Sequence, residues 1–431
     1  MKKFKNENGN KGESKSKKLK ITVAVIACAL TAFFGTYGIS RLQLATLNGI
    51  SVYGDIEANE WNESIPFDAD EYFFLTAEEG AELKVLMLTD THFNNGGWYA
   101  RYFWAGEFEN QSVYADIKKL VKTSEPDFIY LTGDIETDTL NDVIFEDFCD
   151  FMAKFDIPWT MTMGNHDGEQ RADKAKIAEI LSAAENCVFD VGYTNLNGLG
   201  NTVIPVKDGA GAVLYAFVLM DAGDWQLKKD PNKQFSTYEA GYTERQLEWY
   251  EWVIEGLKSR EGRTVGTMLL THIPFHAVTY AAKLVYAGIV LKMPGKTVSA
   301  DDKYIYGTDP FDTESEFGYE NEEYKAFRSA YKTRGDKGYG ILTLESYFEY
   351  AENDAFFKLL KKLGSTDNVV TGHNHCDGYS VLFDGIVYTS VVKTGDIYTA
   401  KSWDNGNRGG TLFKFVNTGS GLEIVSERLF A

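Results

Sequence analysis

The stretch LKVLMLTD, at residues 83–90, is an apolar run that ends in an aspartate. Five further runs have the same design: PDFIYLTGD (126–134), IPWTMTMGNHD (157–167), AVLYAFVLMD (212–221), VGTMLLTH (265–272) and NVVTGHNH (368–375). Short apolar runs that end in polar residues are typical of buried strands. The segments between them, such as TERQLEWYEWVIEGL, have the spacing of helices. The alternation predicts βαβ units and an α/β fold in which helices pack on a sheet.

The chain holds 431 residues, of which 44% are hydrophobic, and this is ample for a substantial core. The net charge is −20, but the first twenty residues carry eight lysines against two glutamates, so the tail is +6 and the rest about −26. An acidic body disfavours a nucleic-acid backbone as the main partner, because phosphate contacts need a basic face. An anionic substrate would need a local positive element, such as bound metal.

Residues 21–39, ITVAVIACALTAFFGTYGI, carry no charge and follow a lysine cluster. As a helix they span roughly 28 Å, enough for a bilayer core. The sequence therefore predicts a basic cytoplasmic tail at 1–20, a transmembrane signal anchor at 21–39, and an extracytoplasmic body at the cell membrane. The alternative is a signal peptide cleaved at ACA (27–29), which would leave the body secreted.

Residues 40–80 are acidic and aromatic without clear periodicity, which predicts a stalk and an entry strand or hairpin onto one domain at 81–431. After residue 375, the runs GYSVLFDGIVYTSV, GTLFKFV and GLEIVSERL predict an antiparallel meander. Residues 277–350 are rich in Tyr, Asp, Glu and Gly and hold few long apolar runs. A loop-rich insertion of this length is usually functional or mobile. Two interpretations of the segment remain, a lid over the substrate and a peripheral decoration.

The six histidines of the chain gather where the predicted strands end. Five stand at or just after a strand end, and His276 follows His272 by four residues. In open α/β sheets, ligands bind outside the carboxyl ends of the strands. The candidate site residues at these ends are Asp90, His92, Asp134, Asn165, His166, Asp167, His272, His373 and His375. Mixed carboxylate and imidazole donors suit Zn, Mn or Fe, and a shared aspartate suits two metals about 3.5–4 Å apart.

Each block alone has an ordinary structural explanation. The D-x-H of residues 90–92 is more often a satisfied strand-end pair, and GNHD (164–167) is compatible with a turn held by Asx hydrogen bonds. His272 alone would more often be structural. The ordered set of blocks is much harder to explain by separate local roles, and it favours a metal site.

The blocks DTH, GD, GNHD, TH and GHNH, spread over residues 90 to 375, resemble the motif order of the calcineurin-like metallophosphoesterases. The resemblance implies a four-layer αββα sandwich of two mixed β-sheets flanked by helices. It also implies two sets of ligands that share Asp134. The first metal would be held by Asp90, His92, Asp134 and His375, and the second by Asp134, Asn165, His272 and His373.

Further features are similar to the purple-acid-phosphatase-like branch typified by a yeast cell-cycle phosphatase and its plant relatives. They are Pro158-Trp159 before GNHD, MDAGD (220–224), Gln246 with Trp249 and Tyr250, and HIPFH (272–276). Purple acid phosphatases have an iron-binding tyrosine where this chain has Thr137, and D-x-G where it has Asp90-Thr91-His92. A ferric–tyrosinate centre is therefore not expected. The sequence leaves the identity of the two metal ions open between Fe, Mn and Zn.

The resemblance implies a metal-dependent phosphoester hydrolase, which we expect to be a phosphomonoesterase in which a water bridging two metals attacks phosphorus. His166 would stabilise the phosphoryl oxygens or protonate the leaving group, with Asp167 orienting it. The alternatives are a phosphodiesterase or pyrophosphatase acting on nucleotides or envelope phospholipid-type substrates, and a catalytically silent membrane-tethered binding protein.

The expected partners are a phosphorylated small molecule or envelope substrate and the cytoplasmic membrane. Arg101, in an aromatic patch that follows the first ligand strand, is a candidate phosphate contact, with core packing as the alternative for the patch. His276 is a second candidate substrate contact, with a surface role as its alternative. Cys376 follows His375 directly, and its side chain is expected on the opposite face of an extended segment.

Overall fold

The computed structural model describes residues 56–57, 59–94, 105–138, 140–223, 226–228, 237–239, 241–275, 278, 337–341, 354–375, 377–383, 385–395, 408–419 and 421–431. All of them belong to the compact unit Tyr53–Ala431. The predicted tail at 1–20 and anchor at 21–39 lie outside the described residues, and so does the predicted insertion at 277–350 apart from 278 and 337–341. Within the described ranges, no helix has the length and apolarity to span a membrane.

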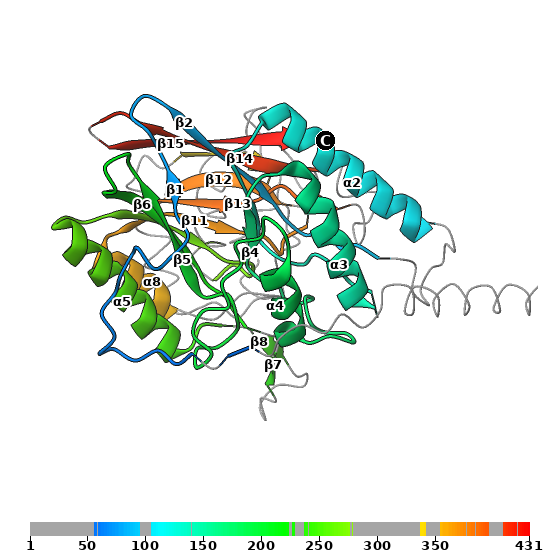
Figure 1. Ribbon diagram of the computed structural model, residues 1–431, viewed down its shortest axis with the longest axis horizontal. Coiled ribbons are helices and arrows are strands. Elements are labelled where there is room, and N and C mark those ends of the chain that lie inside the picture. The colour runs from blue at the N-terminus through cyan, green and yellow to red at the C-terminus, as the bar shows by residue number, and fades with distance from the viewer. Residues whose placement is uncertain are drawn as a thin grey trace, which may run out of the picture. The chain divides into compact units, whose positions relative to one another are not determined.

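Two β-sheets form the centre of this unit (Figure 1). Across the larger sheet the order is β1 (Leu75–Thr76), β5 (Thr202–Lys207), β6 (Val213–Leu219), β9 (Gly266–Leu270), β11 (Thr366–Thr371), β13 (Ile386–Ser390), β12 (Gly378–Phe383) and β10 (Lys337–Ile341). Across the smaller sheet it is β15 (Leu422–Phe430), β14 (Gly409–Asn417), β2 (Glu82–Leu88), β3 (Phe128–Leu131) and β4 (Trp159–Met161). A separate hairpin joins β7 (Gln226–Lys228) and β8 (Thr237–Glu239).

Both sheets are mixed. β2, β3 and β4 are parallel to one another, as are β6, β9, β11 and β13. The predicted meander after residue 375 is wrong as a single unit. The hairpin of β12 and β13 belongs to the larger sheet, whereas the hairpin of β14 and β15 belongs to the smaller one. Local alternation predicts a hairpin but does not specify the sheet that it joins.

Helices cover the outer face of each sheet (Figure 1). The helices α2 (Ala105–Ser124), α3 (Asn141–Met152) and α4 (Lys174–Ala183) pack on the smaller sheet, with a short 3-10 turn at Ala153–Phe155 after α3. The helices α5 (Glu244–Glu261) and α8 (Asp354–Leu363) pack on the larger sheet. A Thr243–Gln246 capping box begins α5, and left-handed Gly262 ends it.

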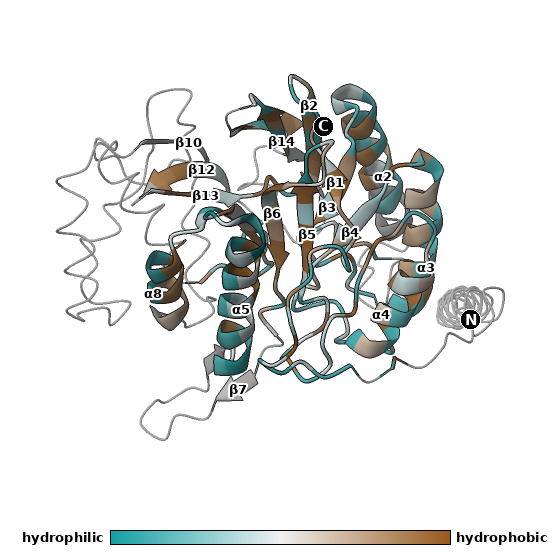
Figure 2. Cartoon of the chain, turned by 60° about the vertical axis from the view of Figure 1, so that its left-hand side comes forward, coloured by the Kyte–Doolittle hydropathy of each residue, from teal (hydrophilic) through white to brown (hydrophobic). Residues whose placement is uncertain are grey.

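Strand side chains alternate between two apolar layers. On β2, Val85 and Met87 pack between the sheets, while Leu86 and Leu88 face the helices α2 to α4. On β6, Phe217 lies between the sheets, and its neighbours face α5. Figure 2 shows that the central strands β5 and β6 are mostly hydrophobic (brown), whereas α5 on the outside is mostly hydrophilic (teal). The predicted four-layer αββα sandwich is confirmed.

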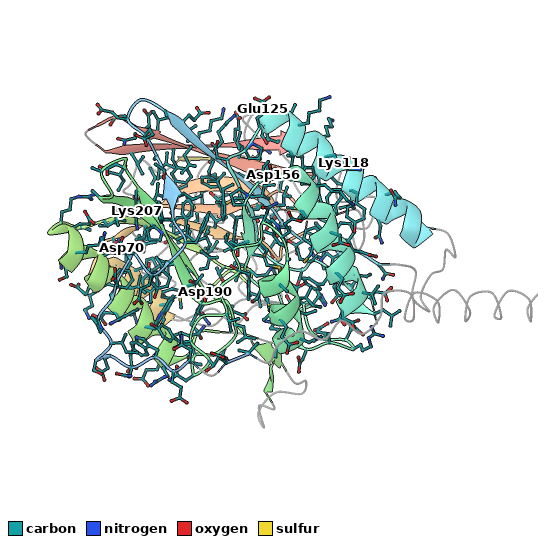
Figure 3. All side chains as sticks on the ribbon, viewed as in Figure 1. Asp70, Lys118, Glu125, Asp156, Asp190 and Lys207 are labelled. Carbon is teal, nitrogen blue, oxygen red and sulfur yellow. The ribbon has the colours of Figure 1, made fainter. Side chains whose placement is uncertain are left out.

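Residues 59–76, the described start of the predicted stalk, form a strap that packs against α5 and the larger sheet. Trp61 is 2% exposed and lies edge-on to Trp252 of α5, with ring centroids 6.1 Å apart. Asn195 binds both the backbone N–H and the carbonyl of Trp61. Further along, Asp70 accepts from Lys207 of β5, with Nζ and Oδ1 2.7 Å apart (Figure 3). This part of the chain is therefore integral to the sandwich.

Candidate metal centre

Strands of both sheets deliver the predicted site residues to one region. Asp90 and His92 follow β2, Asp134 follows β3, and Asn165 and His166 follow β4 of the smaller sheet. His272 follows β9, and His373 and His375 follow β11 of the larger sheet. Each residue stands beyond the carboxyl end of its strand, where α/β sheets bind ligands.

The first group of potential ligands consists of Asp90, His92, Asp134 and His375, whose ligand atoms lie within 4.8 Å of one another. The Nε2 atoms of His92 and His375 are 2.9 Å apart. Asp90 Oδ1 is 3.3 Å from Nε2 of His375 and 3.6 Å from Nε2 of His92. Asp134 Oδ2 is 3.8 Å from Nε2 of His92. Four donor atoms therefore converge on one point.

A second group, Asp134, His272 and His373, shares the aspartate with the first. Its Oδ2 lies 3.1 Å from Nε2 of His272, and the rings of His272 and His373 have centroids 5.2 Å apart. The other oxygen, Oδ1, accepts the backbone N–H of His166 at 2.8 Å. One oxygen of Asp134 thus faces both groups, as a bridging ligand would.

Buried polar atoms without hydrogen-bond partners test whether these groups suit cations. Among the residues that the structure describes, none donates a hydrogen bond to Asp90 Oδ1, Asp134 Oδ2 or Asn165 Oδ1, and none bonds to Nε2 of His272. An unmet buried polar group costs about 1–3 kcal/mol. Carboxylate, amide and imidazole donors are those that Zn, Mn and Fe accept, so the donor set fits two metal ions.

Hydrogen bonds on the far side of the ligands orient them. The hydroxyl of Thr89 donates to Asp90 Oδ2 at 2.5 Å, and the backbone N–H of His373 donates to the same oxygen at 3.0 Å. The Nδ1–H of His272 donates to the carbonyl of Thr132 at 2.7 Å, which leaves Nε2 for a metal. The two threonine hydroxyls also contact each other. In the sequence these two residues are the threonines of LTD (88–90) and LTGD (131–134), to which we assigned no role from the sequence.

The backbone is left-handed at several of these residues. The φ angle is 49° at Asp90, 46° at His92, 53° at Asp134 and 70° at His373. Such angles cost of order 1–3 kcal/mol at non-glycine residues and gather at functional sites. Asp90 and His92 both lie beyond β2, which ends at Leu88. The turns aim the side chains, and the strand does not.

Burial and neighbouring histidines set the charges of the ligands. Burial raises the pKa of Asp90, but the adjacent imidazoles of His375 and His92 outweigh it and hold that pKa well below its usual value. Burial opposes ionisation of Asp134 too, and the charge of His272 lowers its pKa. Burial also lowers the pKa of His92 to about 4. Ionised carboxylates and a neutral imidazole are the forms that bind metals.

His166 stands at the rim of the first group. Its ring centroid is 5.5 Å from that of His92, and its side chain is 38% exposed, whereas that of His92 is 1% exposed. Its Nδ1 lies 2.8 Å from Oε2 of Glu169. Burial lowers the pKa of His166, but the hydrogen bond to Glu169 and the charge of Asp134 raise it to about 9. Our sequence interpretation missed Glu169, which follows GNHD by two residues.

The prediction that Asp167 orients His166 is wrong. The buried carboxylate of Asp167 accepts three backbone N–H groups at 2.8 Å, those of Asp134, Ile135 and Gly164. Burial and the charge of Asp134 raise the pKa of Asp167 to about 6, against the lowering effect of the amides. Asp167 therefore ties the turn after β3 to the turn after β4, and Glu169 is the partner of the imidazole.

Three residues of the predicted site or its surroundings lie outside the described residues. They are Arg101, His276 and Cys376. Their suggested roles as phosphate contact, substrate contact and bystander stay predictions. The assignment of the seven ligands is likewise a prediction, for which the structure supplies the positions.

Comparison with known proteins identifies the family of the chain. The model of the calcineurin-like phosphoesterases matches residues 83–397. An uncharacterized protein of Schizosaccharomyces pombe is 28% identical over 208 residues, which cover 46% of this chain and 37% of that protein. The Arabidopsis thaliana protein named probable inactive purple acid phosphatase 28 is 23% identical over 227 residues, which cover 46% of this chain and 55% of that protein. The chain thus matches at most about half of the length of these two curated relatives.

Among solved structures, a dimetal phosphatase from Danio rerio is 11% identical to this chain, with a TM-score of 0.42. The match covers 80% of this chain and 95% of that one. The expected likeness to purple acid phosphatases is confirmed as a distant similarity. The family match spans most of the sandwich and all seven predicted metal ligands, and the chain belongs to the calcineurin-like phosphoesterases.

Proposed function

We propose that this phosphoesterase hydrolyses phosphomonoesters with two metal ions in the two groups that share Asp134. The shared carboxylate oxygen carries the proposal, because it faces both groups at once. The first ion would be held by Asp90, His92, Asp134 and His375, and the second by Asp134, Asn165, His272 and His373. Bound there, the ions would supply positive charge for the phosphoryl oxygens and lower the pKa of a water.

The charge of the donor set supports a monoester substrate. Asp90 and Asp134 are the anionic ligands of the set, so two divalent ions would leave at most about two net positive charges. A phosphomonoester carries nearly two negative charges at neutral pH, and a diester carries one. The site would supply the attraction for an anion that a body of about −26 lacks.

The position of His166 suits proton transfer to a leaving group. Its side chain is 38% exposed at the rim, while the ligands Asp90 and Asp134 are at most 1% exposed. If the leaving alcohol of a bound substrate points toward solvent, it would lie next to this imidazole. General acid catalysis of this kind contributes about 10²–10⁴-fold.

The test compares p-nitrophenyl phosphate with its bis ester on the purified full-length chain, together with its metal content. We expect two metal ions per chain and a kcat/KM at least about tenfold higher for the monoester. Preference for the bis ester would instead support the phosphodiesterase alternative. Two bound ions without turnover of either compound would support the silent binding protein.

The full set of candidate ligands weighs against a silent protein, although the plant relative is named a probable inactive phosphatase. We expect Asn165→Ala and His166→Ala each to lower kcat by about 10²-fold or more. Unchanged hydrolysis in both variants would contradict the proposal. Glu255→Ala, on the exposed face of α5, is the matched control.

We propose in addition that residues 21–39 anchor the chain in the cell membrane with the sandwich outside the cytoplasm. The uncharged run and the lysines before it support this orientation. Protease added to intact cells should then digest the sandwich, and the chain should sediment with membranes. Protection from protease in intact cells, with digestion after lysis, would contradict it.

A further inference from the structure

The turn after Asn165 has a closed and specific geometry. The backbone N–H of Glu169 donates to the carbonyl of His166 at 3.2 Å. Gly168, between them, has a φ of 112°, and a Cβ there would lie 2.7 Å from the backbone nitrogen of Lys174 at the start of α4. The chain therefore folds back at once, with no room for another residue type at Gly168.

Two residues of this turn, His166 and Asp167, are bonded to the turns that carry the candidate metal ligands. The backbone N–H of His166 donates to Asp134 Oδ1 at 2.8 Å, and Asp167 is held by backbone amides of the turns after β3 and β4. The carboxylate of Glu169 then lies 2.8 Å from Nδ1 of His166. The ring of His166 also lies edge-on to that of His92, with ring centroids 5.5 Å apart. The turn thus places the carboxylate of Glu169 beside the imidazole of His166, with the two side chains 43% and 38% exposed.

We infer that Glu169 is a positioning residue that fixes the imidazole of His166 for proton transfer to the leaving group. This inference rests on the proposed function. The Nδ1–H donates to the Glu169 carboxylate, which fixes the ring about χ2 and keeps Nε2 on the side of the substrate. Without Glu169 the half-exposed ring samples other rotamers, and fewer complexes have the proton donor in place.

The residue should affect the chemical step more than substrate binding. We expect Glu169→Ala to lower kcat by about 10–100-fold, the usual effect of losing an outer hydrogen bond to a functional histidine, with KM changed by less than about threefold. Glu169→Gln keeps an oxygen acceptor for Nδ1–H, so it should recover part of that loss. The deficit should be larger for alkyl phosphates than for p-nitrophenyl phosphate, because a poor leaving group depends more on protonation.

A double-mutant cycle separates this role from a general structural one. If Glu169 acts through His166, the change Glu169→Ala should alter kcat by less than about twofold in a His166→Ala background. The control is Glu255→Ala, which removes an exposed carboxylate paired with Lys258 three residues away and should leave kcat unchanged. Wild-type activity in Glu169→Ala, or the same loss in both backgrounds, would overturn the inference.

A second readout does not depend on hydrolysis. In full-length protein with labelled histidines, the ring nitrogen spectrum of His166 should show a proton held on Nδ1, and Glu169→Ala should remove that signature. If the wild-type chain binds two metals but hydrolyses no phosphoester, the proposed function fails, and this spectrum still decides the positioning. An unchanged His166 spectrum in Glu169→Ala would overturn the inference even in an active enzyme.

Discussion

At the scale of single residues, the centre depends on which oxygen of each carboxylate is already engaged. Asp90 Oδ2 accepts hydrogen bonds from Thr89 and from the backbone of His373. Its Oδ1 lies 3.6 Å from Nε2 of His92 and 3.3 Å from Nε2 of His375. Asp134 divides its oxygens in the same way, between the backbone of His166 and the two groups of ligands. Hydrogen bonds on one oxygen thus aim the other at the candidate metal position.

Thr89→Val should therefore weaken the first metal position without unfolding the protein. Valine has the shape of threonine but lacks the hydroxyl that fixes Asp90, so we expect metal affinity to fall by about 10–100-fold. Titration with Zn or Mn, followed by calorimetry, measures the change. Thr123→Val, at an exposed site on α2, is the control. Equal affinities in all three proteins would contradict the orienting role.

At the scale of elements, the strand-end turns must approach one another closely. Gly133 has a φ of 106°, and a Cβ there would lie 2.5 Å from the backbone nitrogen of Gly164. The turns after β3 and β4 are thus in backbone contact beneath Asp134. A glycine is needed both for the angle and for the space.

Gly133→Ala should destabilise the fold and displace Asp134. Gly211 makes a matched control, because its φ is 90° and a Cβ there would meet nothing within 4 Å. Gly211→Ala should cost about 1 kcal/mol for the angle alone, and Gly133→Ala should cost at least about 2 kcal/mol more for the clash. Denaturant unfolding gives both values. Equal costs would show that the turns can separate.

The strap of residues 59–76 is a second element whose role can be measured. Trp61 is nearly fully buried against Trp252 and Arg245, so Trp61→Ala should lower the free energy of unfolding by about 3–5 kcal/mol. Phe430→Ala, at a side chain that is 45% exposed on β15, should cost less than about 1 kcal/mol. A cost below 1 kcal/mol for Trp61→Ala would mean that the strap does not hold the sandwich together.

At the scale of the whole domain, the centre joins two sheets that have no strand in common. The smaller sheet contributes the residues after β2, β3 and β4, and the larger contributes those after β9 and β11. The segment after β13 adds backbone hydrogen bonds, from Thr394 to the carbonyl of Thr89 and from Gly395 to that of Asp90. Bound ions would therefore link the two halves of the sandwich.

Removal of metal should lower the stability of the whole domain. Ligands that bind only the folded state stabilise it by about 4 kcal/mol at a thousandfold excess over Kd. We expect a chelator to lower Tm by at least about 5 °C, and added Zn or Mn to restore it. His272→Ala should reduce the effect of the chelator, because one ligand of the second group is gone. A Tm that is unchanged by both chelator and added metal would argue against ions in this site.

The αββα layers were expected from the resemblance to the calcineurin-like metallophosphoesterases. The sequence by itself determined strands such as β2, β3, β4, β6, β9 and β11 and the polar residues at their carboxyl ends. These features are local, because apolar runs record burial and the polar residue after each run marks where a strand ends. The tertiary structure decided which sheet each C-terminal hairpin joins, that the strap packs on α5, and that Glu169 rather than Asp167 is the partner of His166. Such choices depend on contacts between distant segments and on turns with left-handed backbone. The alternation of side chains with a period of two applies only to extended chain, so it does not predict these contacts and turns.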